Sequence, residues 1–334
     1  MRVPKHAVRA CSRRTLLAGA ASALIVGPGR VRAQPSAKIL RVGYVGLQGP
    51  DAPTYRAFLS RMEELGYHAG GNFTFDNVQA TSLDDYPVRY AELVSRKPDI
   101  LLTAGSEVAL RAAEGVAGVL PIILLAIDFD PLAKGYVPSL ARPGGNVTGI
   151  FVPQLDLARK RVELTRELLP QARQLGVFWD RASREQAEAA AEAARAVGLA
   201  PRLIEVTGEP PDYAAAFGAM ADAGGEPVVI GASAVFIRDR VEIQAAAREH
   251  SRPMIAPFRE NVVAGAVMSY GVDVVDLFHD IADVVDRVAK GAKPAELPIE
   301  PPTRYHLALN LKSAAALGLS MPQAVLARAD EVIE

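Results

Sequence analysis

The chain of 334 residues carries two successive runs of alternating strand and helix patterns, and this repetition limits its fold more than any other feature. Short apolar runs, such as residues 100–103 and 122–127, alternate with amphipathic helical patterns. Apolar strands without a polar side are typical of parallel sheets that are covered by helices on both faces. The sequence therefore predicts an α/β fold with parallel sheets.

A break between the two runs lies at residues 140–151, which include two adjacent glycines, a strong signal for the end of regular structure. The spacing from a strand glycine to the glycine that ends the next helix is similar on both sides. It is 23 residues from Gly43 to Gly66 and 22 residues from Gly176 to Gly198. We interpret the two runs as two lobes of similar βα topology. The alternative, that any two doubly wound sheets share such spacing, stays open.

The boundaries of the lobes follow from this break and from a late helical pattern. We expect the first lobe to comprise residues 38–148 and about 270–293, and the second to comprise residues 149–269 and about 294–334. Residues 274–288 form a strongly amphipathic stripe, which we expect to pack back on the first lobe. The chain would then cross between the lobes more than once.

The N-terminus has the composition of an export signal. Residues 1–33 contain seven Lys and Arg and no acidic residue, and Arg13-Arg14 precede an apolar run of 11 residues. This run is shorter than the roughly 20 residues that span a bilayer. The pattern predicts a signal peptide that is cleaved near Ala33, with the arginine pair favouring the twin-arginine route and the general secretory route still open. We therefore expect a periplasmic protein.

Removal of residues 1–33 would change the formal net charge from −1 to −8, because 30 Lys and Arg then face 38 Asp and Glu. An acidic exported protein is a poor candidate for binding nucleic acid or anionic membranes. The only cysteine, Cys11, lies in the removed segment. The mature chain would then have neither a disulfide nor thiol chemistry.

Candidate ligand-binding residues are those that directly follow the predicted strands, because ligands of open parallel sheets bind beyond the carboxyl ends of the strands. By this criterion the candidates are Gln48, Gly105, Ser106, Asp128, Phe129, Trp179, Asp180, Ser233, Arg259 and Tyr270.

Several of these candidates have two interpretations. Ser106 and Ser233 would each begin a helix, where free backbone N–H groups favour an anion such as a carboxylate, but serine is also an ordinary helix cap. Arg259 is either a clamp for a carboxylate or a solvated charge. Asp128 could pair with a ligand ammonium, whereas Asp130 directly before Pro131 is a turn residue.

The aromatic candidates also have two interpretations. Trp179, Phe129 and Tyr270 could stack on a ligand or fill the core. Patterns of catalysis and of cofactor binding are missing, since the sequence has neither a G-x-S-x-G elbow nor a Walker A loop, and the glycines at positions 43, 46 and 49 do not form G-x-G-x-x-G. The histidines outside residues 1–33 are isolated, so we expect no catalytic site, metal or cofactor.

Five segments together resemble one protein family. They are residues 41–44, 64–67, 268–271 and 326–333, and above all residues 139–149, which read Ser-Leu-Ala-Arg-Pro-Gly-Gly-Asn-Val-Thr-Gly. From about residue 38 to its end the chain resembles the ABC-transporter substrate-binding family that includes tryptophan- and tyrosine-binding lipoproteins (the TrpX-like group). The resemblance implies a type I periplasmic-binding fold, in which two Rossmann-like lobes joined by a multi-strand hinge close on a ligand.

The same resemblance implies a function. We expect a periplasmic receptor of an ABC importer that captures a small carboxylate-bearing ligand, an amino acid or an aromatic acid, as a monomer without a cofactor. Its partners would be a permease and its ATPase. Members often have Trp-Asn-Pro where this chain has Trp179-Asp180-Arg181, and many have small residues where it has Ile127-Asp128-Phe129, so the tryptophan ligand is not carried over. The alternatives are a ligand sensor that partners a membrane receptor and a periplasmic enzyme that uses Asp128 or Asp130.

Overall fold

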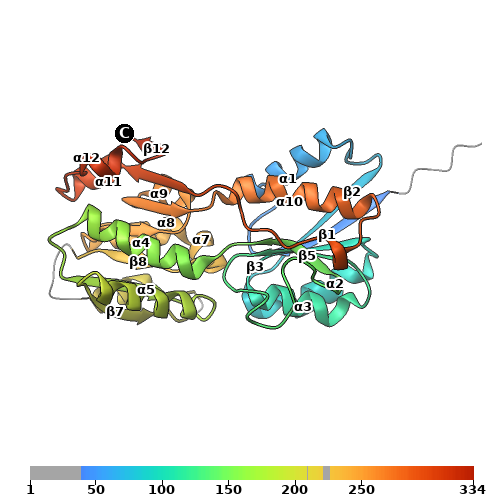
Figure 1. Cartoon of the computed structure of the whole chain (residues 1–334), viewed down its shortest axis with the longest axis horizontal. Coiled ribbons are helices and arrows are strands. Elements are labelled where there is room, and N and C mark those ends of the chain that lie inside the picture. The colour runs from blue at the N-terminus through green and yellow to red at the C-terminus, as the bar shows by residue number, and fades with distance from the viewer. Residues whose placement is uncertain (1–38, 209, 221–225) are drawn as a thin grey trace, which may run out of the picture. The chain divides into compact units, whose positions relative to one another are not determined.

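Two separate sheets organise the computed structural model, which describes residues 39–208, 210–220 and 226–334 (Figure 1). The expected signal peptide, residues 1–33 with its cleavage site near Ala33, lies outside the described residues. Within the described ranges, every helix is too short or too polar to cross a lipid bilayer.

The first sheet has five parallel strands in the order β2-β1-β3-β4-β5. Helices α1 and α10 cover one of its faces and helices α2 and α3 cover the other, so the apolar strands are buried on both sides. The elements are β1 (Leu40–Gly46), α1 (Pro53–Glu64), β2 (Phe73–Gln79), α2 (Tyr86–Ser95), β3 (Ile100–Gly105), α3 (Glu107–Ala117), β4 (Ile122–Ala126), β5 (Val147–Phe151) and, later in the chain, α10 (Val274–Ala289).

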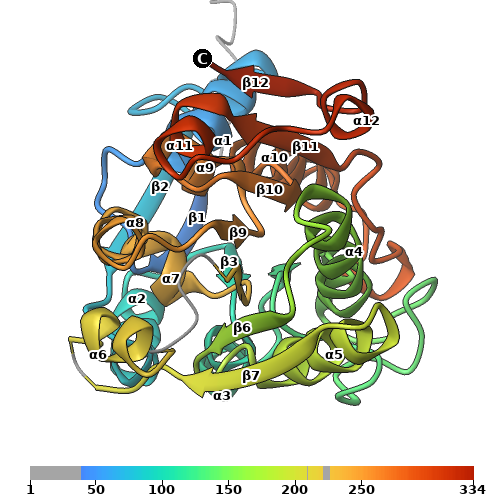
Figure 2. The same ribbon diagram turned by 90° about the vertical axis from the view of Figure 1, so that its left-hand side faces the viewer.

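The second sheet has seven strands in the order β12-β11-β10-β9-β8-β6-β7, and all neighbours are parallel except β10 and β11 (Figure 2). Its elements are α4 (Gln154–Leu168), β6 (Gln174–Trp179), α5 (Arg184–Ala196), β7 (Ala200–Glu205), α6 (Tyr213–Gly218), β8 (Val228–Ile230), α7 (Ala234–Arg238), α8 (Arg240–Glu249), β9 (Met254–Ala256), α9 (Arg259–Ala264), β10 (Met268–Gly271), β11 (His306–Asn310), α11 (Leu311–Ala316), α12 (Gln323–Leu326) and β12 (Glu331–Ile333).

The two lobes share one strand order. The order β7-β6-β8-β9-β10 in the second sheet repeats β2-β1-β3-β4-β5 of the first, with the second strand of each run at the edge. This confirms the prediction of two α/β lobes of similar topology. The antiparallel strand β11 and the strand β12 extend the second sheet beyond the repeat.

The lobe boundaries differ from the expected ones by a few residues at two places and by a whole segment at a third. Strand β5 pairs with β4 as far as Phe151, so it belongs entirely to the first sheet, and β10 stays in the second sheet as far as Gly271. The expectation that residues 294–300 belong to the second lobe is wrong. The N–H of Ile299 donates to the carbonyl of Leu140 (2.7 Å), and the Thr148 hydroxyl donates to the carbonyl of Leu297 (2.9 Å).

Four helices of the second lobe have ends that shape this lobe. Ser183 begins α5 without capping it, because its hydroxyl bonds to the Asp180 carboxylate instead. Helices α7 and α8 meet at Asp239. Helix α6 ends at Gly218.

A buried arginine ties two of the chain crossings together. Arg161 of α4 is fully buried, and its guanidinium donates to the carbonyl of Tyr270 (3.1 Å) and to Oε1 of Gln154 (3.3 Å). No carboxylate pairs with it among the described residues. Arg161 therefore links the end of β10 to the start of α4. These are two of the points where the chain passes between the lobes.

Replacing Arg161 by alanine should lower the free energy of unfolding by about 3 kcal/mol or more, because it leaves a cavity and two buried acceptors without a donor. Urea unfolding followed by circular dichroism measures this. The control is Arg159→Ala on the same helix, whose partners Asp156 and Glu192 are exposed. A loss at Arg161 as small as the loss at Arg159 would show that the buried guanidinium does not hold the hinge.

Candidate functional site

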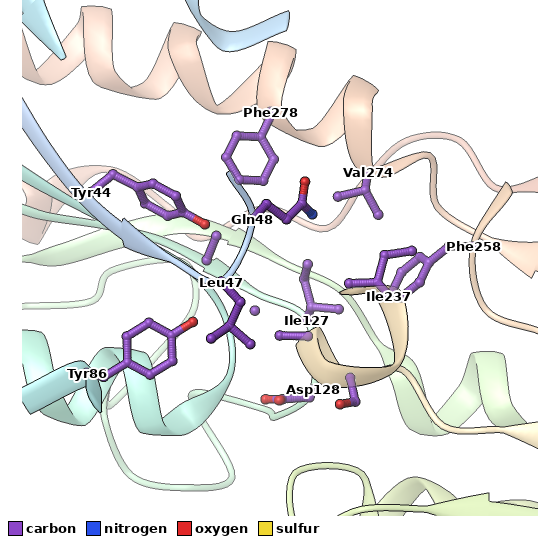
Figure 3. A pocket seen from close by; sticks show the side chains of 14 residues that line it. Tyr44, Leu47, Gln48, Tyr86, Ile127, Asp128, Ile237, Phe258, Val274 and Phe278 are labelled. Atoms are coloured by element: carbon purple, nitrogen blue, oxygen red, sulfur yellow. The ribbon is translucent and has the colours of Figure 1, made fainter. Parts of the chain in front are cut away.

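A small pocket lies between the lobes, at the carboxyl ends of strands from both sheets (Figure 3). Its cavity volume is about 50 Å³, below the roughly 300–1,000 Å³ that is usual for small-molecule sites, so the lobes have to move apart before a ligand as large as an amino acid can enter. Its walls are mainly aromatic and aliphatic. The side chains labelled in Figure 3 are Tyr44, Leu47, Gln48, Tyr86, Ile127, Asp128, Ile237, Phe258, Val274 and Phe278.

Four of the predicted residues meet at this pocket. Gln48, Gly105 and Asp128 reach it from the first lobe, and Ser233 reaches it from the second. Ser106 and Phe129 line a neighbouring groove that shares Asp128 with the pocket. Strand-end loops converge here because the carboxyl ends of parallel strands lie at one edge of each sheet.

Asp128 is the most unusual side chain of the pocket. It is only 7% exposed, and its Oδ1 accepts a hydrogen bond from the backbone N–H of Glu107 (3.1 Å). Its Oδ2 is buried without a hydrogen-bond partner in the structure. Burial raises the pKa of Asp128 well above its usual range, and the negative charges of Asp180 and Glu107 raise it further. The pocket thus contains an acceptor that is not satisfied by the protein.

A second carboxylate approaches from the other lobe. The Ser233 hydroxyl donates to Oδ2 of Asp180, and Oδ1 of Asp180 accepts bonds from the hydroxyl (2.7 Å) and the N–H (3.0 Å) of Ser183. Ser233 in turn caps α7 by accepting from the N–H of Val235 (3.1 Å). Asp180 is therefore fixed behind Ser233, with its negative charge directed at the same end of the pocket as that of Asp128.

The helix start at Ser106 does not present free donors as the sequence suggested. Ser106 caps α3 by accepting from the N–H of Ala109 (3.3 Å), and the next N–H, that of Glu107, is occupied by Asp128. The protein's own carboxylate thus takes the place that was expected for a ligand carboxylate. Ser106 and Ser233 therefore both cap helices, which is one of the two interpretations that the sequence left open for them.

Three predicted residues lie apart from the pocket lining. Arg259 forms a two-bond ion pair with Glu331 (2.5 and 2.7 Å), so its guanidinium is used within the second lobe. Trp179 packs on the core of that lobe and lies 5.7 Å from the guanidinium of Arg184. Tyr270 accepts from Arg161 through its carbonyl and packs near Tyr305. Asp130 binds the N–H groups of residues 132 and 133, which confirms the predicted turn.

The apolar walls contain residues that the sequence reasoning assigned only to the core. Tyr44 lies within β1, and Val274 and Phe278 belong to the first turns of α10. The sequence signal that could have identified Val274 and Phe278 is the position of α10, which begins three residues after the chain leaves the second lobe. A helix that starts at a hinge directs its first turn at the space between the lobes.

Polar contacts join the lobes at the rim of this site. Lys134 of the first lobe pairs with Glu185 of the second, and Arg181 pairs with Asp84 (3.1 Å). Arg238 donates to the carbonyl of residue 81 (3.3 Å). These contacts hold the lobes in a closed arrangement, and each is worth little alone because the side chains are partly solvated.

Lys134→Glu should weaken ligand binding about fivefold, because it replaces one attraction in the closed form by repulsion from Glu185 and Glu107. Calorimetric titration would measure the dissociation constant. Lys160→Glu is the matched control, since Lys160 pairs with Glu163 inside one helix and touches only its own lobe. Equal effects of the two substitutions would show that the rim contact does not favour closure.

The described residues contain no group of three or more His, Cys, Asp or Glu side chains arranged to hold a metal ion.

Two α/β lobes that close over a largely apolar pocket at their strand ends define the class of solute-binding proteins. Residues 51–333 match the family described as ABC transporter substrate binding protein. The chain belongs to this family, which confirms the resemblance seen in the sequence.

Three similar proteins show the range of this likeness. The tyrosine-binding protein of Clostridioides difficile (strain R20291) is 25% identical over 272 residues, which are 79% of this chain and 76% of that protein. An ABC domain from Streptococcus pneumonia in complex with L-Trp has a TM-score of 0.79 and 23% identity, and covers 89% of this chain and 100% of its own. A ligand-free, open substrate binding protein from Clostridium difficile has a TM-score of 0.63 and 21% identity, with coverages of 88% and 99%.

Proposed function

We propose that the protein is the periplasmic receptor of an ABC importer, which captures a small solute between its lobes and presents the closed form to a permease and its ATPase. The observation that carries this proposal is the mainly apolar pocket between the lobes, with one unsatisfied buried acceptor, Asp128. Export through residues 1–33 and a monomeric state belong to the same proposal.

Closure on a ligand is the proposed working motion. The described lobes touch at the pocket and at its rim, and the chain is more similar to the L-Trp complex than to the open, ligand-free protein. A ligand that contacts both lobes shifts the population from open to closed forms, because it binds the closed form better. Binding without turnover is proposed, since the pocket lining offers one carboxylate, Asp128, and one serine, Ser233, whose hydroxyl already donates to Asp180, and it contains no histidine base.

The ligand class follows from the pocket and from the relatives together. One similar protein is named as tyrosine-binding and another was solved in complex with L-Trp, and both of these molecules combine an apolar body with an ammonium group. Here Asp128 would accept the ammonium and the aromatic walls would cover the body. A ligand carboxylate would have no cationic partner in the pocket, because no Lys, Arg or His lines it.

A thermal-shift screen tests the receptor proposal. The protein is first unfolded and refolded to remove copurified ligand, and is then screened with amino acids, aromatic acids and amines. A ligand at 100 times its dissociation constant adds about 2.7 kcal/mol, which raises the Tm of a chain of this length by about 4 °C. Stabilisation by one chemical class supports the proposal, and no stabilisation by any small solute would overturn it.

A further inference from the structure

We propose that the pocket selects a small primary amine with an apolar body and without a carboxylate, such as an arylalkylamine. This inference rests on the proposed receptor function and specifies its ligand. It departs from the amino acids that the relatives bind, and it follows from the charges and donors around the pocket.

The charge around the pocket is negative. Asp128 lines it, Asp180 lies directly behind Ser233, and Glu107 lies beside Asp128. No Lys, Arg or His is among the residues that line the pocket. A buried anion would face two carboxylates without a counterion, whereas a monocation would balance one of these negative charges.

The cations that come closest lie in the neighbouring groove, and most are already paired. Lys134 bonds to Glu185, Arg181 bonds to Asp84 and Arg184 bonds to Glu188. Arg111 lines that groove but does not line the pocket. A ligand carboxylate inside the pocket would therefore have no guanidinium or ammonium to bind.

Some of the groups that could replace a cation as anion donors are also occupied. The N–H of Glu107 at the start of α3 is bound to Asp128, and the Ser233 hydroxyl donates to Asp180. The lining still offers the amide nitrogen of Gln48, whose Oε1 alone is engaged, by Thr54 (3.3 Å), and the hydroxyl of Tyr86. Two neutral donors without a cation suit a hydroxyl or ring substituent better than a desolvated carboxylate.

Asp128 provides the matching acceptor for an ammonium. Its Oδ2 is buried and without a partner, and its Oδ1 is fixed by Glu107, so the carboxylate is held in place before the ligand arrives. In Figure 3, Asp128 lies at one edge of the ring of side chains, and Phe278 and Val274 lie at the opposite edge. A ligand with its ammonium on Asp128 would extend its body between Tyr44, Phe258 and Phe278.

Binding should release a proton. The raised pKa of Asp128 keeps part of the carboxyl protonated in the empty closed site, and an ammonium stabilises the ionised form. The other titratable groups that face Asp128 are Asp180, Glu107 and Tyr86, and Lys134 lies on the groove side. The affinity for an amine should therefore rise with pH until Asp128 is ionised in the free protein.

The test uses four probes of one shape: 2-phenylethylamine, phenylalanine, 2-phenylethanol and 3-phenylpropanoate. We expect the amine to bind at least 100-fold more tightly than each of the other three, with proton release seen as a dependence of the calorimetric enthalpy on the buffer. Asp128→Asn should remove most of this preference and leave the weak binding of the alcohol unchanged. Asp130→Asn removes a charge two residues away but keeps an oxygen that can accept the hydrogen bonds of the turn. It should change neither the preference for the amine nor the binding of the alcohol.

The outcomes separate this inference from the receptor function. Tighter binding of phenylalanine, tyrosine, tryptophan or 3-phenylpropanoate than of the amines would overturn the amine inference and leave the receptor in place. Equal loss of amine binding in Asp128→Asn and Asp130→Asn would also overturn it. If none of these probes and no solute of the wider screen binds, the receptor proposal falls together with it.

Discussion

Alanine at position 149 should prevent the chain from folding stably, because the backbone of β4 occupies the space that a side chain would need. Gly149 lies in β5 opposite Leu124, with φ at +149°, and a Cβ there would lie 1.8 Å from the carbonyl oxygen of Leu124. Leu124 is buried in β4, which is paired with β3 on one side and β5 on the other, so its backbone cannot move aside. We expect Gly149→Ala to lower the free energy of unfolding by more than about 4 kcal/mol.

The control for this substitution lies four residues away. Gly145 is exposed, and a Cβ there would meet no atom within 4 Å, so Gly145→Ala should change the free energy of unfolding by less than about 0.5 kcal/mol. Urea unfolding monitored by circular dichroism compares the two variants. A folded Gly149→Ala variant of normal stability would contradict the close strand approach.

Asparagine at position 128 should stabilise the ligand-free protein at neutral and alkaline pH. A buried, unsatisfied carboxylate destabilises the fold by about 1–3 kcal/mol, and Asn removes the charge while its Oδ1 can still accept from Glu107. The pKa of Asp128 is raised in the folded state, so its destabilising effect is absent below the unfolded pKa of about 4 and develops as the pH rises above it.

The difference in Tm between Asp128→Asn and the wild type should therefore be close to zero at pH 4 and about 2–5 °C at pH 8. Scanning calorimetry of refolded, ligand-free protein measures it. The control Asp130→Asn should show no such trend, because Asp130 is partly exposed and only caps a turn. A stability loss in Asp128→Asn that is constant from pH 4 to pH 8 would show that the carboxylate is satisfied in the native state.

The fold could be predicted from the sequence to a large extent because its signals are local. Buried parallel strands appear as continuous apolar runs, and glycines mark the ends of α1 and α5. The segment 294–300 was assigned to the wrong lobe because its partners, Leu140 and Thr148, lie about 150 residues earlier in the chain. No local pattern records such a pairing, and the same holds for the strand ends at Phe151 and Gly271.

The candidate site was predicted in part, for a related reason. Position after a strand was enough to select Gln48, Asp128 and Ser233, because the fold brings all such loops to one edge. It could not show that Arg259 is paired with Glu331 or that Asp128 occupies the start of α3. These are contacts between distant residues, and they are the reason why we propose a site for an ammonium in place of the expected site for a carboxylate.

The central claim is that a ligand in the pocket draws the two lobes together, and a distance between spin labels tests it most directly. The chain after residue 33 contains no cysteine, so Val88→Cys in α2 and Val241→Cys in α8, both exposed and in different lobes, can be labelled cleanly. A pair within the first lobe, Val88→Cys and Val119→Cys, serves as the control. We expect a broad, long distribution of distances without ligand and a single shorter distance with a ligand that raises the Tm, while the control pair stays unchanged. An inter-lobe distance that does not change when such a ligand binds would contradict it.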